Sequence, residues 1–177
     1  LLKYLGEKKS EPAKIRKALA VNPPIDLKRA SLILSKTKKG RLFNSYFMKP
    51  IHLQGKALAE SFPGSLAPSG NEKTILEFDI HYTAPAAKFN DVDDYYSNCS
   101  AKNYLKDITV PTTILSALDD PFVEPDIFKS VRMSSAINLN SPDQGGHMGY
   151  ISSDLTPWGD CRWMDFKVVD WSGEGRE

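Results

Sequence analysis

Two short stretches of the chain bring together side chains that could transfer a proton. Asp119 and Asp120 follow a strongly β-prone run, and His147 follows two glycines, Gly145 and Gly146. A carboxylate can fix the tautomer of an imidazole, and the imidazole can then accept the proton of a serine hydroxyl. The sequence therefore favours the acid and the base of a Ser-His-Asp relay, with the serine still to be found.

The alternatives for these residues are structural. An Asp before Pro121 often forms a turn, and a loop histidine can be satisfied by backbone groups. The two glycines favour the functional interpretation of His147, because glycine allows a close approach of the backbone or a positive φ. His52 and His81 have no such neighbours, and we expect them on the surface or in a helical insertion.

Three β-prone runs, at 15–21, 110–117 and 136–139, are expected to form the strands that position the acid and the base. In open α/β sheets the ligand crevice lies at the carboxyl ends of the strands, and the second run delivers the two acids to that end. A helix is expected at about 125–131. A last helix, from about residue 161, should bury three apolar side chains, Trp163, Phe166 and Val169.

Residues 26 to about 104 have mostly helical and loop patterns, which makes them an insertion between strands. Asp26 is expected to cap a first helix, the helical pattern that follows ends at Pro50, and a further helix covers about 52–61. Five apolar side chains of this insertion could form either an apolar pocket or the insertion's own core: Leu42, Phe43, Tyr46, Phe47 and Met48.

The first six residues, Leu1 to Gly6, have no initiator Met and show the pattern of a helix end. Their sequence resembles the helix just after the nucleophile elbow in the YheT-like, EMB8-type branch of the α/β-hydrolases. Further stretches that resemble this branch lie at 82–85, 94–96 with Ser100, 119–123, 145–150 and 162–165. The resemblance spans nearly the whole chain.

The resemblance implies an α/β fold in which residues 1–177 are the C-terminal part of an α/β-hydrolase domain. That part would hold the last strands of a mainly parallel sheet, with a helical lid insertion at 26–104 and a flexible tail at 172–177. In this family the elbow G-x-S-x-G lies a few residues before the present segment, so the serine is expected upstream. An internal candidate, Ser65 after Gly64, has its glycine at the wrong offset for an elbow.

The activity that the resemblance implies is carboxylic ester (acyl) hydrolysis by a serine esterase or lipase-like enzyme, with no metal or organic cofactor. Asp120 is assigned as the catalytic acid, because it precedes residues 121–123 as the acid precedes the corresponding turn in this family; Asp119 is the reserve. His147 is the base. Without its nucleophile the chain alone is expected to be inactive. The chain departs from the family near Lys88, where relatives usually have a glycine.

Composition sets limits on the protein's surroundings. The chain has 177 residues, of which 41% are hydrophobic, as is ordinary for a soluble globular protein. Cys99 and Cys161 match no metal or redox spacing, so free thiols and a cytoplasmic location are expected. No apolar run approaches the ~18 residues that suggest a membrane span. The alternative to an enzyme is a non-catalytic truncated remnant or an interaction module.

The charges are unevenly distributed along the chain. Residues 1–60 hold 14 Lys or Arg against 4 acids, whereas residues 61–177 hold 9 against 18. The basic part could make peripheral contact with an anionic membrane surface, or it could be a solvated helix face. It includes Lys28, Arg29, Lys36, Lys38, Lys39 and Arg41. We expect a small-molecule or lipid ester as the substrate and no nucleic-acid partner.

Overall fold

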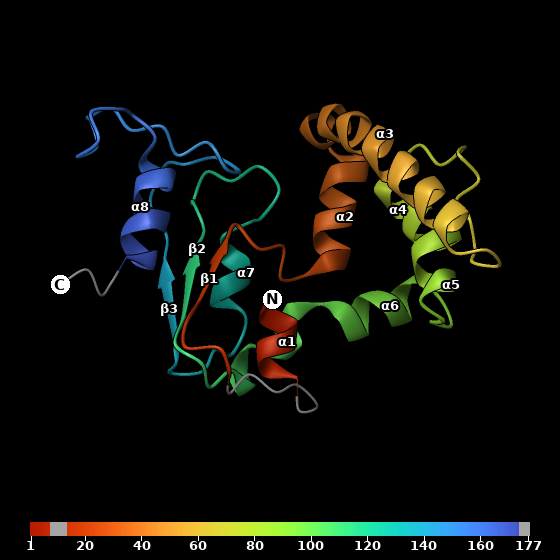
Figure 1. Cartoon of the computed structure of the whole chain (residues 1–177), viewed down its shortest axis with the longest axis horizontal. Coiled ribbons are helices and arrows are strands. Elements are labelled where there is room, and N and C mark those ends of the chain that lie inside the picture. The colour runs from red at the N-terminus through yellow and green to blue at the C-terminus, as the bar shows by residue number, and fades with distance from the viewer. Residues whose placement is uncertain (8–13, 174–177) are drawn as a thin grey trace. The chain divides into compact units, whose positions relative to one another are not determined.

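The computed structural model describes residues 1–7 and 14–173, which form two compact units (Figure 1). The sheet unit combines the N-terminal segment, up to Pro23, with the chain from Lys102 onward. The helical unit is the continuous segment Pro24–Ala101.

Three parallel strands form the centre of the sheet unit, in the order β1-β2-β3 (Figure 1). They are β1 (Ala18–Val21), β2 (Thr112–Leu115) and β3 (Ile137–Asn140). The register pairs the last residues of the strands, Val21 with Leu115 and Leu115 with Asn140. All three carboxyl ends therefore meet at one edge of the sheet, which is where open α/β sheets hold their ligands. The expected parallel sheet is confirmed, although each strand has only four residues.

Helices and helical turns complete the sheet unit. They are α1 (Leu2–Gly6), η3 (Ala101–Asn103, beginning at the unit boundary), η4 (Leu105–Asp107), α7 (Asp126–Lys129) and α8 (Trp163–Ser172). Trp163 and Met164 of α8 pack against a buried cluster that includes Leu115 and Tyr150. The prediction that this helix buries Trp163, Phe166 and Val169 is wrong, because Val169 is 41% exposed and the other two are only partly buried. Of the predicted flexible tail, residues 174–177 lie outside the described part of the chain.

The helical unit begins with α2 (Leu27–Lys36). Asp26 caps this helix as predicted, since its carboxylate accepts a hydrogen bond from the Arg29 N–H at 3.1 Å. The helices that follow are α3 (Lys38–Ser61), α4 (Ile75–Phe78), the π-helical turn η2 (Asp79–Thr83), α5 (Ala84–Ala86) and α6 (Val92–Cys99).

Helix α3 runs without interruption through Pro50, so the prediction of a helix end at this residue is wrong. A proline inside a helix removes one backbone hydrogen bond and costs about 3 kcal/mol. Met48 and Ile51, which lie on either side of Pro50, pack in one cluster with Phe78 and Tyr82. Tertiary packing on both sides of the proline offsets the lost bond.

The same cluster borders a cavity of about 360 Å³ in the helical unit, with largely apolar walls. Its lining includes Gly55, Leu58 and Phe62 of the α3 segment. None of the five apolar side chains predicted for a pocket lines it. Leu42 and Tyr46 are 77% and 74% exposed, whereas Met48 belongs to the core of the unit.

Lys88, the position of the departure from the family, has a φ of 62°. This is the left-handed region, which glycine adopts without steric cost and other residues adopt with strain. The structure thus gives a physical reason for a glycine at this position.

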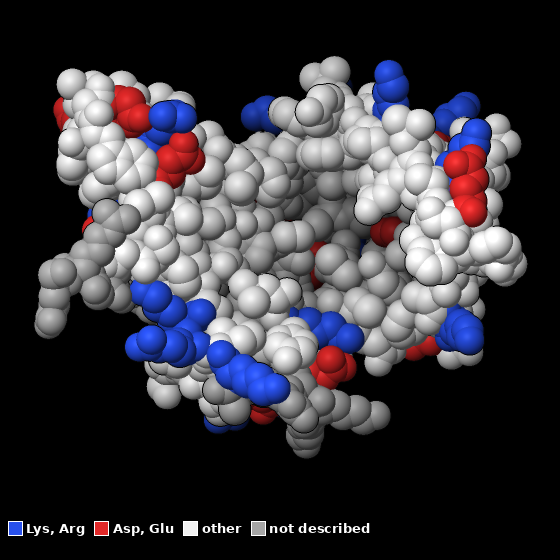
Figure 2. All heavy atoms as spheres, viewed as in Figure 1, with Lys and Arg blue, Asp and Glu red and all other residues white. Residues whose placement is uncertain are grey.

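The basic side chains of the helical unit do not merge into one patch on the face that Figure 2 shows. Blue side chains over this unit lie in separate places, and those at the right of the view border red acidic side chains. Lys28 forms an ion pair with Asp93 at 2.7 Å, and the hydrogen bond with this carboxylate raises the pKa of Lys28. None of the helices described is long and apolar enough to cross a membrane.

Candidate active site

The carboxylate of Asp120 lies just beyond the carboxyl end of β2 and is buried. Its Oδ1 accepts hydrogen bonds from the N–H groups of Phe122 and Val123, at 2.8 and 3.0 Å. These two bonds close the turn that Pro121 begins, and they leave Oδ2 free for a partner. The turn therefore fixes the direction of the carboxylate without using its second oxygen.

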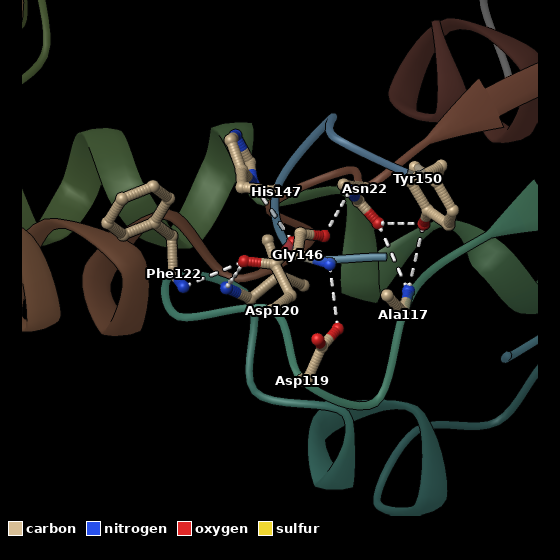
Figure 3. A network of polar contacts seen from close by, with 9 residues as sticks. Asn22, Ala117, Asp119, Asp120, Phe122, Gly146, His147 and Tyr150 are labelled. Atoms are coloured by element: carbon tan, nitrogen blue, oxygen red, sulfur yellow. Dashed lines mark hydrogen bonds and ion pairs between the residues drawn. The ribbon is translucent and has the colours of Figure 1, made fainter. Parts of the chain in front are cut away.

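That second oxygen binds His147. The distance from Asp120 Oδ2 to His147 Nδ1 is 2.9 Å (Figure 3). A carboxylate can only accept, so Nδ1 carries a proton, and in the neutral imidazole Nε2 then presents its lone pair. The His147 side chain is 32% exposed and packs in a T-shaped arrangement with the Phe122 ring, with 4.9 Å between ring centroids. This is the tautomer that a general base needs, with the base facing away from its orienting acid.

Asp119 makes a different contact from its neighbour. Its Oδ1 accepts the N–H of Gly146 at 2.7 Å (Figure 3). The two adjacent acids therefore act on consecutive residues of one loop: Asp119 on the backbone of Gly146, and Asp120 on the imidazole of His147.

Each glycine before His147 meets one of the two requirements predicted for it. Gly146 has a φ of 57°, in the left-handed region. Gly145 is closely packed: a Cβ atom there would lie 2.4 Å from the Tyr150 ring and 2.9 Å from the Cβ of Ala117. The sequence-based expectation of a positive φ or a close approach is confirmed.

Two residues near His147 had no role in the sequence-based prediction. Asn22 directly follows β1, is 2% exposed and has a φ of 42°. Its Oδ1 accepts from the Tyr150 hydroxyl at 2.7 Å and from the Ala117 N–H at 3.2 Å, and its Nδ2 donates to the Gly146 carbonyl at 3.1 Å (Figure 3). The available signal was an asparagine at a strand end, because asparagine tolerates a left-handed backbone.

Tyr150 completes this network. Its hydroxyl accepts a further hydrogen bond from the Ala117 N–H at 3.0 Å. Burial raises the pKa of Tyr150, and the hydrogen bonds from Ala117 and with Asn22 only partly counteract this. The hydroxyl therefore keeps its proton at neutral pH and donates it to Asn22.

No serine among the described residues forms a hydrogen bond with His147. Ser116, directly after β2, is fully buried, and its hydroxyl has no hydrogen-bond partner within residues 1–7 and 14–173. Ser65 lies in an exposed turn of the helical unit, where its hydroxyl donates to the Phe62 carbonyl at 2.7 Å. Neither serine stands in the turn between a strand and a helix that exposes a nucleophile.

The other histidines lie in the helical unit. His81 is exposed in the π-helical turn. His52 belongs to α3, where its Nε2 lies 3.0 Å from the Glu72 carbonyl oxygen. As predicted, neither joins the Asp120–His147 pair.

A parallel sheet with flanking helices, an acid after one strand and a histidine after the next is the arrangement of the α/β-hydrolases. Comparison with curated proteins agrees with this class. The protein named "Putative esterase YheT" of Escherichia coli (strain K12) is 27% identical over 97% of this chain. The chain is thus similar over nearly its whole length to a YheT-like protein, and its parallel sheet with flanking helices is consistent with the α/β-hydrolase fold.

Other relatives match part of the chain. Medium-chain fatty acid ethyl ester synthase/esterase 2 of Saccharomyces cerevisiae is 36% identical over 54% of the chain. Human monoacylglycerol lipase ABHD2 is 24% identical over 74% of the chain. The chain spans 51% of YheT, 22% of the yeast protein and 30% of the human lipase. No protein-family model and no solved structure matches the chain.

Proposed function

We propose that this chain supplies the acid, Asp120, and the base, His147, of a serine-type carboxylic ester hydrolase. The observation that carries the proposal is the 2.9 Å contact between Asp120 Oδ2 and His147 Nδ1. The other oxygen of the acid is fixed by two backbone N–H groups, so the pair is oriented before any substrate binds. The nucleophile is a serine encoded upstream of Leu1, in the chain order Ser, acid, His.

In this mechanism His147 Nε2 accepts the proton of the serine hydroxyl as the oxygen attacks the ester carbonyl. It then gives the proton to the leaving alcohol, and in the second half of the reaction it activates water in the same way. Asp120 stays ionised, holds the Nδ1–H tautomer and stabilises the imidazolium that forms. No step requires a metal or an organic cofactor.

The substrate class we propose is an ester of a fatty acid. The names of two relatives support it: one is a medium-chain fatty acid ethyl ester synthase/esterase and one a monoacylglycerol lipase. A peripheral contact with an anionic membrane surface remains a prediction. It draws on the basic N-terminal part of the sequence, of which Lys28 already has an acidic partner in Asp93.

The test begins with the nucleotide sequence upstream of the Leu1 codon. An in-frame G-x-S-x-G a few codons before it supports the enzyme, whereas a start codon next to it supports the non-catalytic remnant. The product that includes this upstream sequence should react with a fluorophosphonate probe at its serine. Reaction that persists undiminished in a His147→Ala variant would contradict the role of His147 as the base.

A further inference from the structure

We propose that Asn22 is a positioning residue for His147, an inference that rests on the function proposed above. Its amide ties the loop of the base to the carboxyl ends of β1 and β2. The geometry of the Asp120–His147 pair then depends on a residue more than 120 positions away in the sequence.

The argument starts with Gly146, the residue directly before His147. Both polar groups of Gly146 are held by side chains from strand ends. Its N–H donates to Asp119 after β2, and its carbonyl accepts from Asn22 after β1. Gly146 has no side chain, and a Cβ atom there would meet nothing within 4 Å, so packing does not restrain this backbone position and the two hydrogen bonds do. Together they fix the direction in which the chain enters His147.

The Asn22 amide also binds the segment that follows His147. The Tyr150 hydroxyl, three residues after His147, donates to Asn22 Oδ1 at 2.7 Å. The Tyr150 ring stacks on Trp163, with 5.9 Å between centroids, and its N–H donates to the Gly145 carbonyl at 2.8 Å. The Asn22 side chain therefore forms hydrogen bonds with the loop both before and after His147 (Figure 3).

Asn22 is itself rigidly placed. Its backbone N–H continues the ladder of the sheet by donating to the Leu115 carbonyl at 2.7 Å, and Oδ1 also accepts from the Ala117 N–H. Only an uncharged amide can serve here, because the site needs an acceptor for two donors and a donor for one carbonyl. An aspartate would keep the acceptor but place a charge against the Gly146 carbonyl.

The primary test is an NMR measurement on the 177-residue chain with labelled histidine. In the wild type we expect a slowly exchanging, low-field signal from the His147 Nδ1–H, because this proton is held by Asp120. Asn22→Ala should abolish the signal under conditions where circular dichroism shows a folded chain. Asn22→Asp, which keeps the side-chain shape, should also abolish the signal. This variant replaces Asn22→Ala in the test if the alanine variant does not fold.

Asn44→Ala is the matched control. Asn44 is also a buried asparagine, 3% exposed, with Nδ2 donating to the Lys73 carbonyl and Oδ1 accepting from the Ile75 N–H, all within the helical unit. Its loss should lower the melting temperature to a similar extent and leave the His147 signal unchanged. A signal that survives in both Asn22 variants, or that Asn44→Ala abolishes equally, would overturn the proposal.

Kinetics of the product that includes the upstream sequence separate this inference from the proposed function. We expect Asn22→Ala to lower kcat about 10²-fold with little change in KM, the size of loss that a misplaced catalytic group can cause. A wild type without activity would contradict the proposed function and leave the NMR test standing. An active wild type with an unimpaired Asn22→Ala variant would contradict the positioning role alone.

Discussion

Each unit contains a histidine beside a buried carboxylate: His147 with Asp120 in the sheet unit and His52 with Glu72 in the helical unit. The carboxylates are similarly inaccessible, with side-chain exposures of 0% and 1%. The contacts differ. His147 Nδ1 lies 2.9 Å from its carboxylate, whereas His52 Nδ1 lies 3.6 Å from its own, beyond hydrogen-bond range.

The difference lies in which groups remain free. The Glu72 carboxylate accepts hydrogen bonds from neighbouring residues: from the N–H and hydroxyl of Ser69 and from the N–H of Gly70. His52 directs Nε2 to the Glu72 carbonyl, so neither nitrogen presents a base outward. In the sheet unit Asp120 reserves one oxygen for His147, whose Nε2 is left open. Proximity of an acid and a histidine is therefore not enough to make a site.

The largest predicted difference between the two histidines concerns the removal of each imidazole. In the product that includes the upstream sequence, His147→Ala should lower kcat by about 10⁶, the loss seen when the base of a serine hydrolase is deleted. His52→Ala should change kcat less than about threefold while lowering the melting temperature. Steady-state hydrolysis of para-nitrophenyl esters measures both. Equal losses of kcat in the two variants would mean that the two pairs do not differ in function.

Exchange of the acids for amides is the next largest effect. Asp120→Asn should lower kcat by about 10⁴, because an amide can present its own N–H to Nδ1 and stabilise the wrong tautomer. Asp119→Asn should be much milder, since its carbonyl can still accept from the Gly146 N–H. The same ester assay compares the two. A severe Asp119→Asn with a mild Asp120→Asn would reverse our assignment of the acid.

The pH dependence of stability tests the structural role of Glu72. Burial acts to raise the pKa of Glu72, but the hydrogen bonds from Ser69 and Gly70 together hold it below its ordinary value of 4.5. A lowered pKa in the folded state stabilises the protein above pH 4.5, and the contribution is lost as the pH falls through the folded pKa. Thermal melts of the wild type and Glu72→Gln should therefore differ at pH 7, and the difference should shrink as the pH falls below 4.5. A constant difference would contradict this role.

The smallest predicted effect concerns two of the non-glycine residues with a positive φ, Asn22 and Lys88. Lys88→Gly should raise the free energy of unfolding by about 1 kcal/mol, because it removes a strained conformation. Asn22→Gly relieves the same strain but also removes the amide, so it should destabilise the chain. Chemical denaturation measures both. A gain in stability from Asn22→Gly would show that its amide contacts contribute little.

The sequence allowed features that depend on local patterns to be predicted, but not those that depend on contacts between distant residues. Asp120, His147 and the role of the glycines were accessible because each lies in a local pattern next to a strand or a turn. Asn22 was not, since its partners lie 95 to 128 residues away and only the register of the sheet brings them together. Pro50 was misjudged for a related reason: the packing of Met48 and Ile51 outweighs a local rule that the sequence does show.

The most direct measurement is hydrolysis of para-nitrophenyl acetate by two proteins, the 177-residue chain and the product extended by its upstream coding sequence, each with its His147→Ala variant. We predict that the chain alone is no faster than its variant, because the proposed nucleophile is encoded upstream of it. We predict that the extended product is active and loses this activity with His147. Two results would contradict the account: faster hydrolysis by the chain alone than by its His147→Ala variant, or hydrolysis by the extended product that His147→Ala does not reduce.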